Sequence, residues 1–327
     1  ENAPAAIALL KELLLNGRYD ETGRIYETVQ QSDYFMKQSL ISSGHMYALS
    51  KALSAFSADA ALKETLSGES YIRWFSELAA GFEAHAPEHA ATLSALAARA
   101  FARNRLFVGY SGSLEPSLIE ELIDALPELE PAGHAEYPRY DSSPCCVEIL
   151  SDVGYSALGH NVYALGSEFC GAYTVLASLV SYGYLWGAVR VQGGAYGTGM
   201  NVRSSGDIFC YSYRDPNLEG SDCAFRGIVD FLDEFLEQAM PLDDIIIGTV
   251  NTTAPLLDPA GVCELECARH LNHAEPGGIA RLRREILSTK PEDLAALRDV
   301  LKKYVKNAKL CAVGNKNAVA FIGDSES

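Results

Sequence analysis

Glycines at positions 193, 194, 197 and 199 constrain the local fold of this sequence more than any other feature. Because glycine reaches positive φ and allows close approach to another chain, this run predicts a tight turn. Arg190 and Tyr196 lie in the same run, and an aromatic segment, 208–213, follows it. An arginine and a phenol held over such a turn can bind a peptide carbonyl or a developing oxyanion. The alternative is a turn between helix and strand in which Tyr196 only packs.

The chain is acidic, with 43 Asp and Glu against 26 Lys and Arg and a formal net charge of -17. Nothing in the sequence resembles the basic stripe of a nucleic-acid-binding protein. The charge favours cationic partners such as basic peptides, although acidity also serves plain solubility. The 8 cysteines stand mainly in apolar runs, without the dense spacing of a small secreted scaffold, which favours a reducing cytoplasm.

Residues 171–188 carry no charge and approach the length of a membrane-spanning helix. The stretch is rich in Ser, Gly and Tyr and has no basic flank, so it predicts a helix buried against a sheet and no membrane span. Residues 1–17 form an amphipathic helical pattern without the basic start of a signal peptide. The sequence also lacks an initiator Met, which is typical of a fragment of a longer protein.

The first third of the sequence is predicted to be mainly helical. Helical patterns cover 1–17, 22–56 with a break near 42–44, 71–78, 91–101 and 118–126. A strand is expected at 106–110, and the Pro- and Gly-bearing segment 127–138 is a predicted linker. We interpret 1–126 as the helical remainder of a domain whose sheet is mostly absent or contributed from upstream.

Residues 139–327 are predicted to form a complete α+β domain. Its expected strands are 146–150, 154–158, 190–196, 207–213 and 310–313. An amphipathic helix is expected at 222–240, and three further helices before the last strand. Thr289 and Glu292 predict a capping box for the last of these helices. This order predicts helices packed on one face of a largely antiparallel sheet.

His85, Glu88 and His89 spell H-x-x-E-H. On a helix the two histidines would share a face as zinc ligands, with Glu88 as the base that activates water. Glu168 is a candidate third ligand. Pro87 opposes this interpretation, because inside a helix proline removes a hydrogen bond and costs about 3 kcal/mol. The surrounding sequence predicts a loop between two helices.

Cys263, Cys267, His270 and His273 are a second set of residues with metal-ligand chemistry. On one helix the first three share a face and His273 does not. A structural zinc usually takes pairs of ligands from two separate elements. We therefore interpret this set as packing thiols and surface histidines.

Segments 190–197 and 211–216 together resemble the C-terminal half of the presequence-protease type of insulinase-family (pitrilysin-type) zinc metallopeptidases. The resemblance covers most of the chain. Further matching segments are 14–18, 42–45, 108–112, 151–155 and 284–287. The resemblance implies four related α+β domains in two bowl-shaped halves that close around a peptide, with the zinc and its H-x-x-E-H in the N-terminal half.

By motif position, Arg190 and Tyr196 would be the side chains that the C-terminal half supplies to that site, where the tyrosine helps to stabilise the tetrahedral oxyanion. Gly193, Gly194 and Ala195 would contact the substrate. The implied partners are peptides and the N-terminal half of the same protein, with zinc in the complete enzyme and none bound to this segment. His85, Glu88 and His89 fall outside the family's catalytic domain, so we interpret them as a coincidence.

Two other functions stay open at this point. The chain would be a catalytically silent subunit if it only shaped a chamber and held peptides. It would be a self-contained zinc hydrolase if His85, Glu88 and His89 bound a metal. The resemblance favours the half of a peptidase, which should not hydrolyse peptides by itself.

Overall fold

The computed structural model describes residues 2–113, 115–130, 133 and 145–324. The chain forms two compact units whose segments interleave along the sequence. Unit 1 comprises Glu1–Tyr34, Phe75–Glu136 and Leu256–Pro276; unit 2 comprises Phe35–Trp74, Tyr137–Pro255 and Gly277–Ser327. The expected domain boundaries stay a prediction, and much of the expected linker, 127–138, lies outside the described residues.

Unit 1 consists of helices and irregular segments over its described residues. Its helices are α1 (Ala3–Leu15), the first part of α2 (Thr22–Ser42), the end of α5 (Glu69–Gly81), α6 (Ala86–Ala100), α7 (Pro116–Ala125) and α12 (Pro259–Leu271), with short 3-10 helices at Phe82–His85 and Arg103–Arg105. Phe82 is buried against Tyr26, with ring centroids 5.8 Å apart. The apolar contact anchors the short helix between α5 and α6.

The strand expected at 106–110 is wrong. Within the described part of unit 1 no strand pairs with this segment, which contacts α12 instead. Phe107 stacks on His270 with ring centroids 5.0 Å apart, and Gly109 lies against the thiol of Cys267. An apolar segment becomes a strand only where a neighbouring backbone accepts and donates its hydrogen bonds.

Unit 2 contains a five-stranded sheet that confirms the predicted α+β class. Its strands are β1 (Cys145–Glu148), β2 (Gly154–Asn161), β3 (Gly197–Val202), β4 (Asp207–Asp215) and β5 (Lys309–Gly314). They lie in the order β1-β5-β2-β4-β3, and every neighbouring pair is antiparallel except β1 and β5. In the centre of the sheet Leu158 lies opposite both Cys210 and Leu310.

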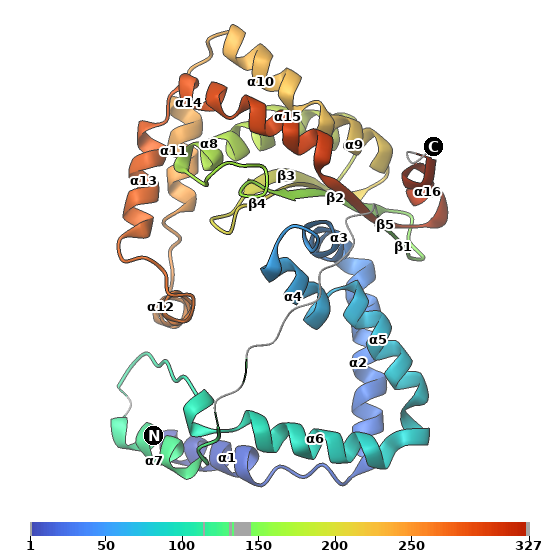
Figure 1. Ribbon diagram of the computed structural model, residues 1–327, viewed down its shortest axis with the longest axis vertical. Helices are drawn as coiled ribbons and strands as arrows, with labels where there is room; N and C mark the ends of the chain where they lie inside the picture. The colour runs from blue at the N-terminus through green and yellow to red at the C-terminus, as the bar shows by residue number, and fades with distance from the viewer. Residues whose placement is uncertain (1, 114, 131–132, 134–144, 325–327) are drawn as a thin grey trace. The chain divides into compact units, whose positions relative to one another are not determined.

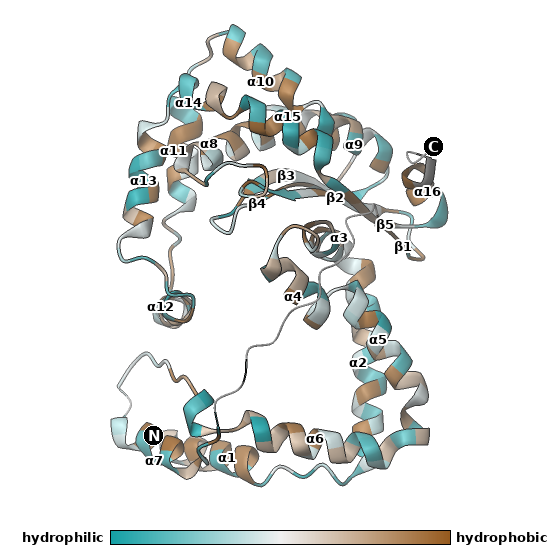
Figure 2. Cartoon of the chain, in the orientation of Figure 1, coloured by the Kyte–Doolittle hydropathy of each residue, from teal (hydrophilic) through white to brown (hydrophobic). Residues whose placement is uncertain are grey.

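One face of this sheet carries the larger hydrophobic core. The helices packed there are α8 (Gly171–Val180), α9 (Leu218–Arg226), α10 (Ile228–Glu237), α11 (Asp243–Thr252), α13 (Gly278–Ser288), α14 (Pro291–Ala296), α15 (Arg298–Asn307) and α16 (Lys316–Asp324) (Figure 1). Leu158, Ile208 and Phe225 are completely buried in it. Figure 2 shows hydrophilic and hydrophobic residues mixed along α10, α13 and α15, as expected for helices with one buried face.

The opposite face of the sheet is covered by α3 (Gly44–Leu53). Helices therefore lie on both faces of the sheet, whereas the sequence predicted them on one; the predicted layer is the one with the larger core. Ala52 and Leu53 pack there against Ala157 and Phe209.

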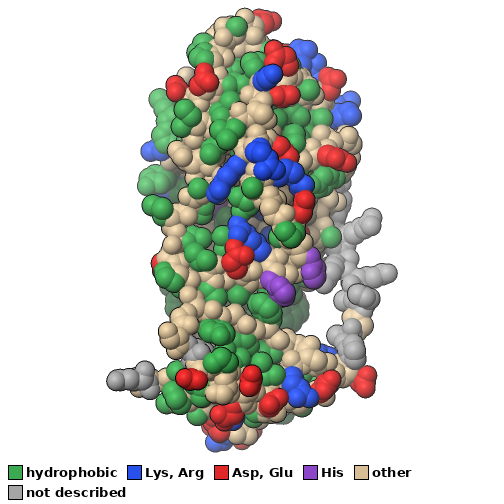
Figure 3. Space-filling view, turned by 90° about the vertical axis from the view of Figure 1, so that its left-hand side faces the viewer, with side chains coloured by type: hydrophobic (Ala, Val, Ile, Leu, Met, Phe, Trp, Pro, Cys, Tyr) green, Lys and Arg blue, Asp and Glu red, His purple; other side chains and the backbone are tan. Residues whose placement is uncertain are grey.

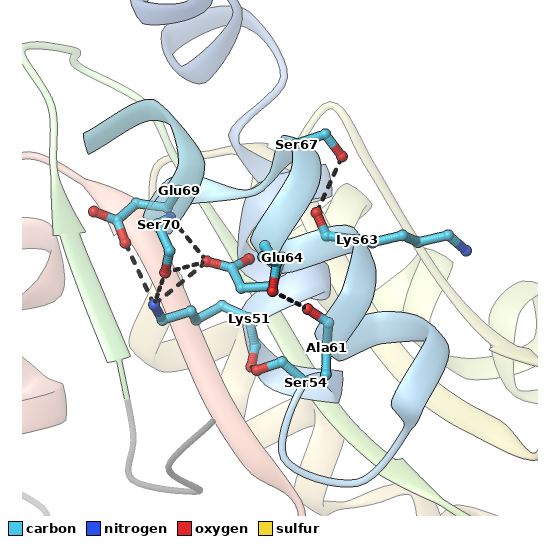
Figure 4. A network of polar contacts seen from close by, with 9 residues as sticks. Lys51, Ser54, Ala61, Lys63, Glu64, Ser67, Glu69 and Ser70 are labelled. Atoms are coloured by element: carbon cyan, nitrogen blue, oxygen red, sulfur yellow. Dashed lines mark hydrogen bonds and ion pairs between the residues drawn. The ribbon is translucent and has the colours of Figure 1, made fainter. Parts of the chain in front are cut away.

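Next to α3, α4 (Ala58–Ser67) carries a completely buried carboxylate, Glu64. Figure 4 shows its contacts with Lys51 of α3 (3.4 Å) and with the hydroxyl of Ser70 (2.9 Å). A buried charge needs such partners.

The strand expected at 190–196 is also wrong. The uncharged helix α8 continues directly into a π-helix, Ser181–Gln192, and β3 begins only at Gly197. The hydrogen bonds of the π-helix, which join residues five apart, continue to its C-terminal end, where the Gly193 N–H donates to the Ala188 carbonyl at 3.0 Å. Within the described residues, no helix is long and apolar enough to cross a membrane.

The helix expected at 222–240 is two helices, α9 and α10, separated by Gly227. The Gly227 N–H donates to two carbonyls of α9 and ends it. A side chain at this position would clash with the hydroxyl of Tyr184, 2.5 Å from an added Cβ. The glycine therefore allows Tyr184 to approach closely at the break between the two helices.

The region after α10 is more divided than expected. Five helices, α11 to α15, precede β5 instead of three. The capping box also differs by one residue: the Asp293 carboxylate accepts the Lys290 N–H at 2.8 Å, whereas Thr289 donates its hydroxyl to the Glu285 carbonyl. Pro291 begins α14, which makes Lys290 the cap.

On the face drawn in Figure 3, basic side chains gather in the region of α13, which carries Arg281, Arg283 and Arg284.

Candidate functional site

The turn between the π-helix and β3 places Arg190 and Tyr196 close together. The Gly194 N–H closes the helix end by donating to the Arg190 carbonyl at 3.1 Å, and the φ of Gly194 is +84°. Such a φ suits glycine. Ala195 is buried, and its N–H donates to the Val189 carbonyl at 3.1 Å. The turn is therefore fixed by its own backbone.

Tyr196 is held at its backbone and exposed at its ring. Its N–H donates to the carbonyls of Tyr213 and Arg214 at 3.1 and 3.2 Å, at the end of β4. The side chain remains 67% exposed. A phenol on a fixed backbone with an accessible hydroxyl is suited to donate a hydrogen bond to a bound group.

The guanidinium of Arg190 lies over two aromatic rings. It is 4.1 Å from the ring centroid of Trp186 and 5.7 Å from that of Tyr196. Over the residues that the structure describes, it forms no ion pair with a carboxylate. The cation–π contacts orient the group and leave its N–H donors free for a carbonyl oxygen.

Trp186 is the residue of this site that the sequence reasoning missed. It is 40% exposed and lies one helical turn before Arg190. Trp186 and Arg190 are four residues apart, a spacing that brings two side chains together on a helix. The strand expected at 190–196 hid this relation, because side chains four apart on a strand do not meet in this way. The three residues predicted to contact substrate, Gly193, Gly194 and Ala195, use their N–H groups within the turn, and their substrate contact stays a prediction.

The H-x-x-E-H segment has a different structure from the expected loop. His85 ends a 3-10 helix, and Pro87 lies in the first turn of α6, where proline is tolerated. His85 Nδ1 is 3.3 Å from Glu88 Oε2, and the His89 ring stacks on Phe82 with centroids 5.0 Å apart. Glu168 belongs to unit 2, whereas these residues belong to unit 1.

The described residues do not fit a zinc centre. No group of three or more His, Cys, Asp or Glu side chains among them could hold a metal ion. The second candidate set lies on and just after α12: Cys267 contacts Gly109, His270 stacks on Phe107, and His273 has a φ of +49° beyond the helix end. These contacts are those of packing residues.

Comparison with known proteins identifies the family. Residues 146–317 match the PreP C-terminal domain, and residues 1–78 match the peptidase M-16C-associated region. The chain belongs to the presequence-protease family. Its matched regions belong to the C-terminal half of such a peptidase, which confirms the resemblance seen in the glycine turn and in segment 211–216.

Two curated relatives cover most of the chain. Protein HypA of Clostridium perfringens is 25% identical over 319 residues, which are 96% of this chain and 33% of the relative. Presequence protease 1 of Arabidopsis thaliana is 28% identical over 295 residues, which are 87% of this chain and 27% of the relative. The chain thus spans about a third or less of the length of these two relatives.

A solved structure supports the fold of the presequence-protease-type chain. A conserved protein from Enterococcus faecalis superimposes with a TM-score of 0.58 at 13% identity, covering 97% of this chain and 75% of that one. At this identity the similarity establishes the fold alone.

Proposed function

We propose that this chain is the C-terminal half of a zinc-dependent peptidase that degrades unstructured peptides in a closed chamber. In this proposal Arg190 and Tyr196 act on the scissile carbonyl. The zinc is held by the N-terminal half, outside this sequence. Cytoplasmic location and a preference for basic peptides stay predictions from the sequence.

The observation that carries the proposal is the fixed backbone and exposed ring of Tyr196 beside an arginine without a carboxylate partner among the described residues. Cleavage of a peptide bond moves negative charge onto the carbonyl oxygen. A phenol O–H and a guanidinium N–H held side by side can stabilise this charge with little reorganisation. Membership of a peptidase family supports the same assignment.

Arg190 and Tyr196 divide the work by their chemistry. The guanidinium carries a permanent positive charge and orients a peptide carbonyl through N–H donors. The phenol donates one hydrogen bond, which strengthens as the oxygen becomes negative. Trp186 supports the guanidinium from below and offers an exposed apolar surface beside it. The chain therefore contributes charge stabilisation and positioning.

Tyr196→Phe in the complete protein tests this role. Loss of a transition-state hydrogen bond lowers kcat by about 10²- to 10³-fold and changes KM little. Tyr163→Phe is the matched control, because Tyr163 is 48% exposed and its hydroxyl donates to the Ser204 carbonyl at 2.9 Å. A kcat of Tyr196→Phe equal to that of the wild type would remove Tyr196 from the mechanism.

The open reading frame that encodes this chain separates the peptidase half from a silent chamber subunit. An in-frame upstream segment with H-x-x-E-H supports the peptidase. A complete frame without that segment supports a subunit that binds peptides without hydrolysing them.

A further inference from the structure

The ring of Tyr213 lies between the turn that carries Tyr196 and the start of α3. It meets the Tyr196 ring edge-on, with centroids 5.8 Å apart and an interplanar angle of 68°. It also meets the ring of His45 edge-on, at 4.8 Å and 80°. Both contacts have the edge-to-face geometry that aromatic pairs prefer. All three residues belong to unit 2.

The backbone ties Tyr213 to Tyr196 a second time. The Tyr196 N–H donates to the Tyr213 and Arg214 carbonyls. Arg214 has a φ of +47°, which is uncommon for a residue with a side chain and marks a specified turn of the chain. The Tyr196 ring is 67% exposed, and its ring contacts within the described residues are those with Tyr213 and Arg190.

The start of α3 is clamped to the sheet beside Tyr213. Any side chain at Gly44 would collide with the ring of Tyr155. The Tyr155 hydroxyl donates to the Ile41 carbonyl at 2.7 Å and fixes the preceding residues. Tyr155 also lies 5.6 Å from Tyr213, ring to ring. The glycine therefore permits the close approach that places His45 on Tyr213.

The ring of His45 is suited to packing. Its Nδ1 is buried and has no hydrogen-bond partner within the described chain. Burial lowers the pKa of His45 below its ordinary value, which keeps the imidazole neutral at pH 7. A neutral planar ring on the edge of Tyr213 restricts the rotation of that ring.

We infer that Tyr213 and His45 are positioning residues for Tyr196, joining segments 42–45 and 211–216 to the candidate site through a row of rings. The inference rests on the proposed function for its effect on turnover, but the ring positions can be tested without it. Neither residue is assigned a contact with substrate. Their contribution is to hold the Tyr196 phenol in one orientation.

The experiment uses the complete protein with 3-fluorotyrosine incorporated at position 196 and observed by ¹⁹F NMR. Tyr213→Leu and His45→Ala remove one ring each, whereas Tyr213→Phe keeps the ring and loses only the hydroxyl. Tyr211→Leu is the matched control: Tyr211 is also half-buried on β4 and lies 6.1 Å from His45, but forms no ring contact with Tyr196 within the described residues. Peptide hydrolysis is measured on the same variants without the fluorine label.

We expect Tyr213→Leu and His45→Ala to shift and broaden the resonance at position 196, and Tyr213→Phe and Tyr211→Leu to leave it in place. In hydrolysis, loss of a ring contact corresponds to a roughly 3- to 10-fold lower kcat with KM little changed. Rescue by Tyr213→Phe separates positioning from the chemistry of the Tyr213 hydroxyl.

Two results overturn the inference. One is an unchanged resonance in both Tyr213→Leu and His45→Ala. The other is an equal change in Tyr211→Leu, which would indicate general disruption of the sheet. A wild-type kcat for Tyr196→Phe refutes the proposed function alone, because the NMR result still decides whether Tyr213 and His45 position the ring. If Tyr213→Leu does not fold, His45→Ala, which lies outside the strand, carries the test.

Discussion

Replacing Tyr304 of α15 by phenylalanine removes a single oxygen that joins a helix to two strands. Tyr304 is completely buried. Its hydroxyl donates to the Leu158 carbonyl of β2 at 2.7 Å and accepts the Cys210 N–H of β4 at 3.0 Å. Leu158 and Cys210 are paired across the sheet. Burial raises the pKa of Tyr304 well above its usual value, so the hydroxyl keeps its proton at any ordinary pH.

The expected loss follows from the two hydrogen bonds. Each contributes about 1 kcal/mol net, and a buried polar group left without a partner costs about 1–3 kcal/mol. Phenylalanine fills nearly the same volume, so a cavity adds little. We expect Tyr304→Phe to lower the free energy of unfolding of unit 2 by about 2–3 kcal/mol. For a unit of this size that corresponds to a fall in Tm of roughly 4–12 °C.

Urea denaturation of the complete protein, followed by hydrogen exchange in peptides from β2 and β4, measures this loss where it occurs. Tyr163→Phe is again the control, because it removes an exposed hydrogen bond and should change the free energy by less than about 0.5 kcal/mol. Equal free energies for Tyr304→Phe and Tyr163→Phe would refute the reasoning that burial sets the cost.

Three further predictions concern a buried ion pair, a buried histidine and metal binding. Glu64→Gln breaks the buried ion pair with Lys51 and should lower the free energy of unfolding by about 3 kcal/mol. Asp59→Asn, in an exposed pair with Lys63, should lower it by less than about 1 kcal/mol. Similar losses for the two variants in denaturant titrations would contradict this. Burial lowers the pKa of His160, which stacks on Phe56, so the unfolded chain binds the proton first. Stability should therefore fall as pH drops below about 6.5, and His160→Gln should flatten this fall in denaturation at several pH values; equal slopes would exclude His160. Finally, zinc analysis of the complete protein should give the same stoichiometry for wild type and for His85→Ala/His89→Ala; loss of metal would revive the zinc hydrolase.

The sequence predicted those features that depend on local pattern. Most helices of the first third appear where the apolar spacing placed them, with the break at Ser43 between α2 and α3, but α4 was not predicted and α6 begins within the expected loop. The strands β2 and β5 also lie where runs of apolar residues predicted them. In each case the pattern and the surrounding structure favour the same conformation, so local reasoning is sufficient.

The wrong predictions share one cause. Segment 106–110 is apolar and short enough for a strand, but it contacts α12. Segment 190–196 was expected to be a strand beside the glycine turn, but 190–192 end the π-helix and 193–196 form the turn. Short apolar runs do not distinguish a strand from a buried helix or coil, because the choice depends on which backbone lies alongside. Gly227 misled the expectation at 222–240 for the same reason, since its closeness to Tyr184 is a tertiary fact.

The family and the α+β class follow from the sequence, because motif spacing and hydrophobic pattern are properties of the chain. The same motif positions predicted Arg190 and Tyr196 as site residues, and their role stays a prediction. Only the tertiary structure placed His45 beside Tyr213 and assigned Phe35–Trp74 to the unit that contains the sheet. The physical reason is that ring contacts and burial depend on distances through space, which residues far apart in sequence acquire only when the chain has folded.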